Sequence, residues 1–206
     1  MVALVSTDRT GARQPGALTL SEDDRRVLAE WAADCVERTL PLFSASAPGD
    51  ERPKKAIEGT RAFARGELQI GAARALAFDA HAAAREAADP AATAVARAAG
   101  QAVAVAHMGS HALGVAYAAV AAARSRPHDP RAAMAELTWQ IDHASPEVRA
   151  AIRKLPIRDN GRGLLGQLVQ RLQSSLASDT TNRDSAFTPP PVRRDDPFER
   201  PGRAAL

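Results

Sequence analysis

Residues 91–124 read AATAVARAAGQAVAVAHMGSHALGVAYAAVAAAR, an almost unbroken run of alanine, valine and glycine. Alanine is the strongest helix former, and a helix that is apolar nearly all round is buried. The same run carries four polar side chains, Arg97, Gln101, His107 and His111. Polar groups need hydrogen-bonding partners when they are buried. The stretch therefore predicts a buried helix with a row of polar side chains. Whether that row is structural or forms a binding site depends on the groups to which it hydrogen-bonds.

The rest of the chain also has the pattern of helices. Ser21 and Ser145 are placed to cap helix starts, Pro53 and Pro146 fit first helical turns, and Gly66 fits a helix end. Pro41 disfavours helix at the residue before it, so the first helix is expected to end near residue 40. No run alternates polar and apolar residues with the period of a strand. We expect helices over residues 21–40, 50–66, 67–88, 90–125 (bent near Gly109), 130–143, 145–155 and 164–177. The predicted fold is an all-α, compact, alanine-rich bundle of about six to seven helices.

Composition divides the chain into three parts. Residues 1–20 contain glycine and proline without periodicity, which predicts a flexible N-terminal arm. Residues 178–206 contain a triple proline at 189–191 among arginines and acids, with too few apolar residues to order themselves. We expect an all-helical domain over residues 21–177, followed by a disordered C-terminal tail.

Charge and cysteine content narrow the class of protein. The net charge is only +3 although the pI is near 9.6, which argues against a broad nucleic-acid surface. The single cysteine, Cys35, lies in an apolar helical pattern and is expected in the core, which suits the cytoplasm. No apolar leader is visible, and the most apolar stretch, 95–122, contains polar residues that are costly in a membrane. We expect a cytoplasmic protein that binds neither nucleic acid nor membranes.

Histidines and arginines are the candidates for a binding site. His107 and His111 have the spacing of a helical zinc pair, but the glutamate of the metalloprotease helix motif is absent. Hydrogen-bonded core histidines are therefore the expectation, with no metal, no cofactor and no catalytic residue. Arg74, Phe78, His81 and Arg85 share one face of the preceding helix, where clustered arginines need acidic partners or an anion. The ligand-pocket candidates are His81, Arg85, Arg97, Gln101, His107 and His111.

Several segments resemble one bacterial family. They are RPKKAIE at 52–58, RAFARGE at 61–67, AHAAAR at 80–85, ARAAGQAVAVAH at 96–107 and ALGVAY at 112–117. Together they resemble the immunity-five-like immunity proteins of polymorphic toxin systems, over roughly residues 24–153. The resemblance implies an α-helical, non-enzymatic protein that binds a cognate toxin and masks it. The residues that carry it are expected mainly to hold the helices together: Arg52, Ile57, Arg61, Phe63, Glu67, His81, Arg85, Arg97, Gln101, His107 and His111.

A second interpretation stays open beside the immunity function. The six pocket candidates could line a cavity between the helices predicted at 67–88 and 90–125 and serve an enzyme, or a small-molecule or metal-binding protein, in a biosynthetic pathway. That interpretation requires a concave cavity at this seam. The immunity interpretation instead predicts a well-filled core, an exposed binding patch and a cognate protein toxin as partner. A regulator acting on nucleic acid is a third class, but no recognition motif is visible.

Overall fold

The regular structure of this protein is entirely helical in the part of the chain that its computed structural model describes, namely residues 16, 18–157, 161 and 163–178. The predicted all-α class is confirmed. The helices, in chain order, are α1 (Glu22–Glu37), α2 (Leu40–Ser46), α3 (Arg52–Ala64), α4 (Ile70–Glu86), α5 (Pro90–Ala104), the 3-10 helix η1 (Gly109–Val115), α6 (Ala116–Ser125), α7 (Ala132–Asp142), α8 (Pro146–Arg153) and α9 (Leu164–Ala177). The described residues thus contain more helices than the predicted six to seven.

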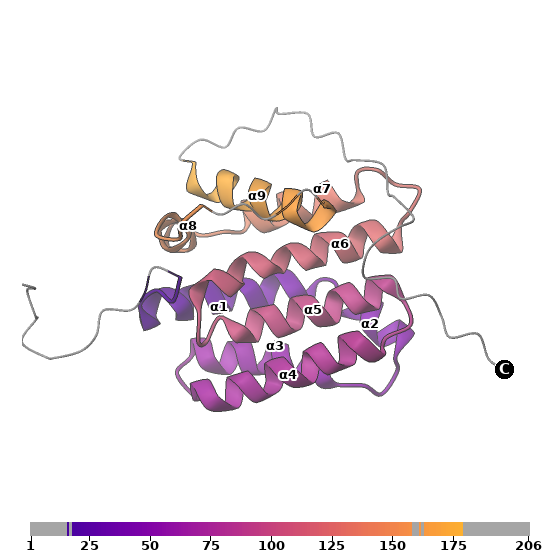
Figure 1. Cartoon of the computed structure of the whole chain (residues 1–206), viewed down its shortest axis with the longest axis horizontal. Helices are drawn as coiled ribbons and strands as arrows, with labels where there is room; N and C mark the ends of the chain where they lie inside the picture. The colour runs from indigo at the N-terminus through magenta and orange to yellow at the C-terminus, as the bar shows by residue number, and fades with distance from the viewer. Residues whose placement is uncertain (1–15, 17, 158–160, 162, 179–206) are drawn as a thin grey trace, which may run out of the picture.

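Helix α5 is the centre of the molecule. It contacts α1, α2, α3, α4, α6 and η1, and Val95 and Val103 are almost completely buried with the alanines around them. Figure 1 shows α5 between α4 below it and α6 above it, with α7, α8 and α9 forming an upper tier. Because alanine and glycine let helix backbones approach closely, one helix can have this many neighbours. The predicted buried, alanine-rich helix is confirmed.

The single helix predicted over residues 90–125 is wrong. The chain leaves the helix after Ala104, becomes extended at Met108 and returns as η1 and α6, so that α6 lies beside α5 (Figure 1). The Gly109 and Ser110 N–H groups donate to the carbonyls of Thr19 and Leu18 at 3.0 Å each, instead of bonding within a helix. Glycine is a weak helix former, and a distant segment supplies the lost acceptors. The bend expected near Gly109 is a reversal of the chain.

Helix α2 was not predicted. The sequence suggested that Pro41 ends the preceding helix near Leu40, whereas α1 ends at Glu37 and Pro41 lies in the first turn of a new helix. Proline fits that position because it lacks only an N–H that has no partner within the helix. The caps predicted at Ser21 and Ser145 are both present, with their hydroxyls accepting from the N–H groups of Asp24 and Val148.

The structure describes only a small part of the predicted N-terminal arm and C-terminal tail. Most of the predicted arm (residues 1–15 and 17) and nearly all of the predicted tail (residues 179–206) lie outside the described residues. Leu20, at the end of the predicted arm, is only 5% exposed and packs in the core. Cys35 is fully buried, as predicted. Among the residues that the structure describes, no helix has both the length and the apolarity needed to cross a membrane.

Candidate functional site

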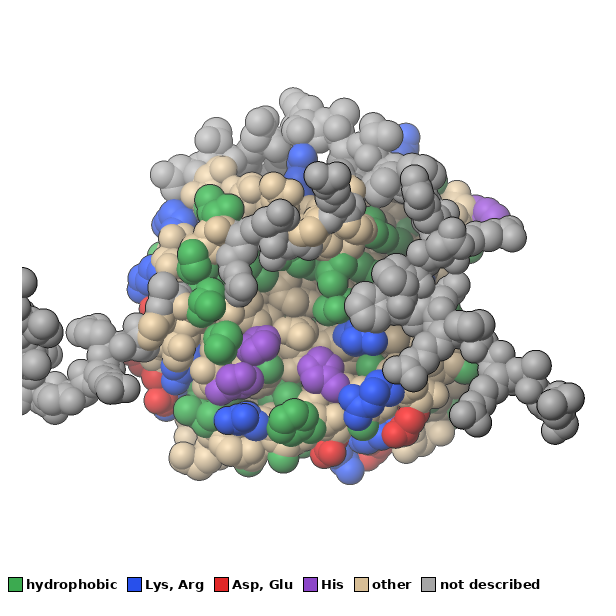
Figure 2. All heavy atoms as spheres, in the orientation of Figure 1, with side chains coloured by type: hydrophobic (Ala, Val, Ile, Leu, Met, Phe, Trp, Pro, Cys, Tyr) green, Lys and Arg blue, Asp and Glu red, His purple; other side chains and the backbone are tan. Residues whose placement is uncertain are grey.

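Three histidines gather where α4, α5 and η1 meet. His81 comes from α4, His107 from the loop after α5 and His111 from η1. The ring centroids of His107 and His111 are 4.9 Å apart, and the His81 ring lies against Gly100, where an added Cβ would come within 2.6 Å of it. Figure 2 shows the three histidines side by side at the lower edge of a central hollow. We call these three residues the histidine cluster.

One histidine of the cluster is held by a glutamine of α5. The His111 Nδ1–H donates to Gln101 Oε1 at 2.7 Å, since a carbonyl oxygen can only accept. This bond sets the tautomer of His111. Gly114 allows the contact, because a Cβ there would lie 2.5 Å from Gln101 Cβ. Glycine at position 114 therefore lets η1 lie directly against α5, which carries the glutamine that bonds His111.

All three histidines favour the neutral form. Burial lowers the pKa of His111 to about 4, with the neighbouring histidines His107 and His81 adding to the effect. Burial also lowers the pKa of His81, helped by Arg97 and Arg85. The pKa of His107 is lowered by burial first, and then by Arg74 and Arg25. At neutral pH the cluster is thus uncharged, and the positive charge around it comes from arginine.

The zinc-pair spacing of His107 and His111 would need a continuous helix through both residues, which the chain reversal removes. Nδ1 of His111 is bonded to Gln101. In the described residues, no group of three or more His, Cys, Asp or Glu side chains is placed to hold a metal ion.

The second interpretation of the sequence placed a cavity between α4 and α5. The seam between α4 and α5 is filled by small side chains, including the buried Ala73, Ala80 and Ala84, and by His81 against Gly100. Arg85 is exposed on α4 and Arg97 is half-buried on α5, both close enough to His81 to lower its pKa. The six candidates therefore lie close together in space.

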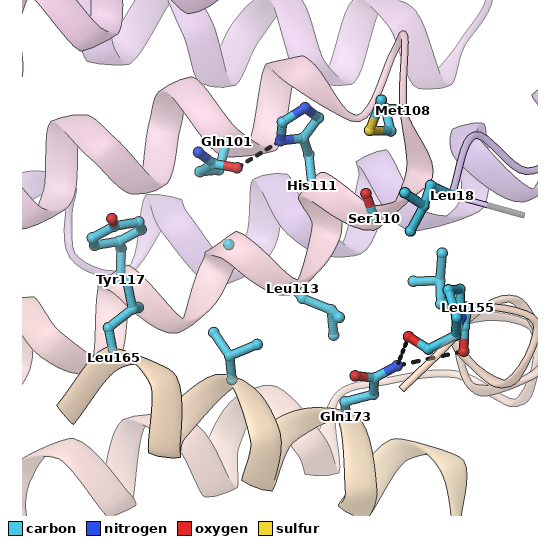
Figure 3. A pocket seen from close by; sticks show the side chains of 13 residues that line it. Leu18, Gln101, Met108, Ser110, His111, Leu113, Tyr117, Leu155, Leu165 and Gln173 are labelled. Carbon is cyan, nitrogen blue, oxygen red and sulfur yellow. Dashed lines mark hydrogen bonds between the residues drawn. The ribbon is translucent and has the colours of Figure 1, made fainter. Parts of the chain in front are cut away.

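A pocket of about 290 Å³ opens on the other side of α5, toward α9. Of the six candidates, Gln101 and His111 line it (Figure 3). The remaining walls come from the N-terminal segment, the loop before η1, η1 itself, α6, the stretch after α8, and α9. Among the described residues, no charged side chain lines the pocket. The other lining residues are Leu18, Met108, Ser110, Leu113, Gly114, Tyr117, Leu155, Pro156, Leu165, Val169 and Gln173. The sequence did not predict that these residues line a pocket. The leucine pattern of residues 164–177 predicts a helix that packs against the core, but it does not indicate which elements the helix contacts.

The fold and the site define an all-helical protein with an alanine-packed core and a neutral histidine cluster at the meeting point of three elements. Residues 18–147, well over half of the chain, match the family described as Imm-5 like putative immunity protein. The chain belongs to this family. The match spans α1 to α7 and ends as α8 begins, so α9 and its pocket wall lie outside it. No curated protein and no solved structure matches the chain.

Proposed function

We propose that this protein is an immunity protein that binds a cognate toxin and neutralises it by masking the toxin's working surface. The observation that carries the proposal is membership of the Imm-5 like family across residues 18–147. Masking needs a rigid body that keeps its shape as it binds, and the alanine-packed bundle around α5 suits that need. No chemical step is required of the protein.

The histidine cluster supports this function as part of the scaffold. The Nδ1–H of His111 donates to Gln101, and the His81 ring packs against Gly100. Arg52 and Arg61 have similar roles: Arg52 pairs with Asp50 and Glu86, and Arg61 reaches three acids of α1. These contacts hold α1, α3 and α4 together, which is the role the resemblance implied for such residues.

Co-expression tests the proposal directly. The toxin domain encoded nearest to this protein's gene is induced in a bacterial host, with and without the full chain. We expect growth only when the chain is present, together with a complex of defined stoichiometry in native mass spectrometry. Cells that die equally in both cultures, with no complex formed, would contradict the function.

The pocket beside α9 favours a second candidate function, the binding of a small uncharged molecule. Its volume of about 290 Å³ is near the lower end of small-molecule sites, and apolar walls surround the polar groups of Gln101, Ser110 and Tyr117. Native mass spectrometry of the protein from its own host tests this candidate. A bound molecule that is absent from a Val169→Trp variant, which fills the pocket, would support it. A ligand-free chain in both preparations would refute it.

A further inference from the structure

Helix α4 has most of its large side chains away from the core, although Leu76 packs against it. At 100° per residue, five residues fall within an arc of about 80°, and we call them the α4 face: Ile70, Arg74, Phe78, His81 and Arg85. The residues that α4 buries are all alanines, namely Ala73, Ala77, Ala80, Ala83 and Ala84. Alanines and Leu76 make the core contacts of α4, so the helix does not need an aromatic residue for its own packing. Phe78 is therefore available for another contact.

Exposed apolar side chains are concentrated on this face. Phe78 is 67% exposed and Ile70 is 40% exposed, and in the described part of the chain the other large apolar side chain this exposed is Ile157. Ile70 and Phe78 lie eight residues apart, with Arg74 between them. Single exposed apolar residues are ordinary, whereas a grouped pair on one helix face is typical of a protein contact.

The charge of the α4 face has one sign. Arg74 and Arg85 stand on either side of Phe78, and within the described residues neither forms an ion pair. The acids of α4, Asp79 and Glu86, point about 120–140° away from the centre of the arc. Glu86 is moreover paired with Arg52.

Three neighbouring elements contribute further nitrogen-bearing side chains near the face. Arg97 comes from α5, His107 from the loop and His111 from η1. Figure 2 shows basic and apolar side chains below the histidines, with acidic side chains at the lower edge of the same view. A partner of opposite charge is therefore favoured on this side of the molecule.

We propose that the α4 face is the surface that contacts the toxin, and that the toxin offers it an apolar pocket rimmed by carboxylates. Phe78 fills the pocket, and Arg74 and Arg85 pair with the carboxylates. Aromatic and arginine side chains are enriched among the few residues that dominate the binding energy of protein interfaces, so this residue set is suited to the centre of one. The inference depends on the proposed function and names its binding surface.

The dimensions favour a protein partner over nucleic acid. Arg74 and Arg85 are eleven residues apart, which is about 16 Å along a helix, and this fits within a standard interface of about 800 Å² per partner. Nucleic-acid surfaces need a longer basic track than two arginines, and the net charge of the chain is only +3. The apolar Ile70 and Phe78 also have no counterpart on a phosphate backbone.

Calorimetric titration of the full chain with the toxin domain encoded nearest to its gene tests the surface. Phe78→Ala should weaken binding by about tenfold or more, and the double variant Arg74→Glu, Arg85→Glu should weaken it by about a hundredfold. The controls Ile157→Ala and Arg126→Glu alter an even more exposed apolar residue and an exposed arginine elsewhere, and should stay within about twofold. Unchanged melting curves would show that the α4 variants are folded.

The outcomes separate the two proposals. Binding by the unaltered chain that persists within about twofold in both α4 variants would overturn the surface and leave the function standing. No binding by the unaltered chain would overturn both. Tight binding of a labelled DNA or RNA duplex that is lost in the arginine variant, while toxin binding persists, would assign the face to nucleic acid and also overturn the proposal.

Discussion

Gly114 determines how closely η1 lies against α5. A side chain at this position would place its Cβ 2.5 Å from Cβ and Cγ of Gln101, and Cβ is fixed to the α5 backbone. Gln101 also holds His111, so a shift of η1 would affect both the packing and the hydrogen bond. The absence of a side chain at position 114 therefore allows the close packing that positions His111 in the histidine cluster.

Gly114→Ala should lower the free energy of unfolding by about 1–3 kcal/mol, because overpacking a fixed contact forces the backbone to move. Denaturation by urea measures the change. The control is Gly71→Ala, since a Cβ on Gly71 meets nothing within 4 Å and alanine is the better helix former. Equal stability of the two variants would mean that η1 can adjust at no cost.

The histidine cluster makes stability depend on pH. His111 has a pKa of about 4 in the folded chain and near 6.5 when unfolded. As the pH falls through this window, the unfolded chain takes up a proton that the folded chain does not. The free energy of unfolding should therefore be highest above about pH 6.5 and decrease toward pH 4, and the lowered pKa values of His81 and His107 act in the same direction.

Denaturant unfolding between pH 7 and pH 5 measures this dependence, since that range lies above the ordinary titration of carboxylates. His111→Gln removes one titrating group and retains a side chain that can bond Gln101, so its slope against pH should be shallower. NMR titration of the imidazole signals should show that His111 remains neutral at pH 5. An identical slope in the variant would exclude His111 as the source.

At the scale of elements, η1 depends on a segment far from it in sequence. The carbonyls of Leu18 and Thr19 accept the N–H groups of Ser110 and Gly109, and Leu20 packs on Gly109. Leu20 holds this position with a φ of 63°, a conformation that a leucine rarely adopts. The end of the predicted arm thus has a structural role at the point where α5 gives way to η1.

A chain that begins at residue 21 should lose about 2–5 kcal/mol of stability, the sum of two hydrogen bonds and one buried leucine. Hydrogen exchange at the Gly109 and Ser110 amides should become fast, while exchange in α5 falls only with overall stability. A chain that begins at residue 16 retains both carbonyls and serves as the control. Protected amides in the shorter chain would show that η1 forms without this segment.

At the scale of the whole molecule, α9 closes the upper tier although it lies outside the family match. Leu168, Leu172 and Leu176 are fully buried, and α9 contacts α6, α7, α8 and η1. It therefore contributes core to the tier above α5, and it also forms one wall of the pocket.

A chain that ends at residue 163 should unfold without a cooperative transition or melt far below the full chain. Three fully buried leucines contribute about 5–9 kcal/mol, which is comparable to the whole stability of a typical domain. Near-ultraviolet circular dichroism during heating measures the transition, and a chain that ends at residue 178 is the control. Equal melting temperatures would mean that residues up to 163 form a complete core.

The sequence alone determined the helical class, the buried character of α5, the burial of Cys35 and the caps at Ser21 and Ser145. Each of these follows from local propensity or from the period of apolar residues, which depend on neighbours within a few positions. The single face carrying Arg74, Phe78, His81 and Arg85 was also visible, because it depends only on helical geometry.

Only the tertiary structure decided where the chain reverses and where the pocket lies. The break after Ala104 requires acceptors from Leu18 and Thr19, about ninety residues away, and the pocket requires α9 to pack beside Gln101 and His111. Alanine and glycine permit close approach without specifying which neighbour approaches. The choice of partner therefore came from burial and hydrogen bonding across the whole chain, which a local pattern does not contain.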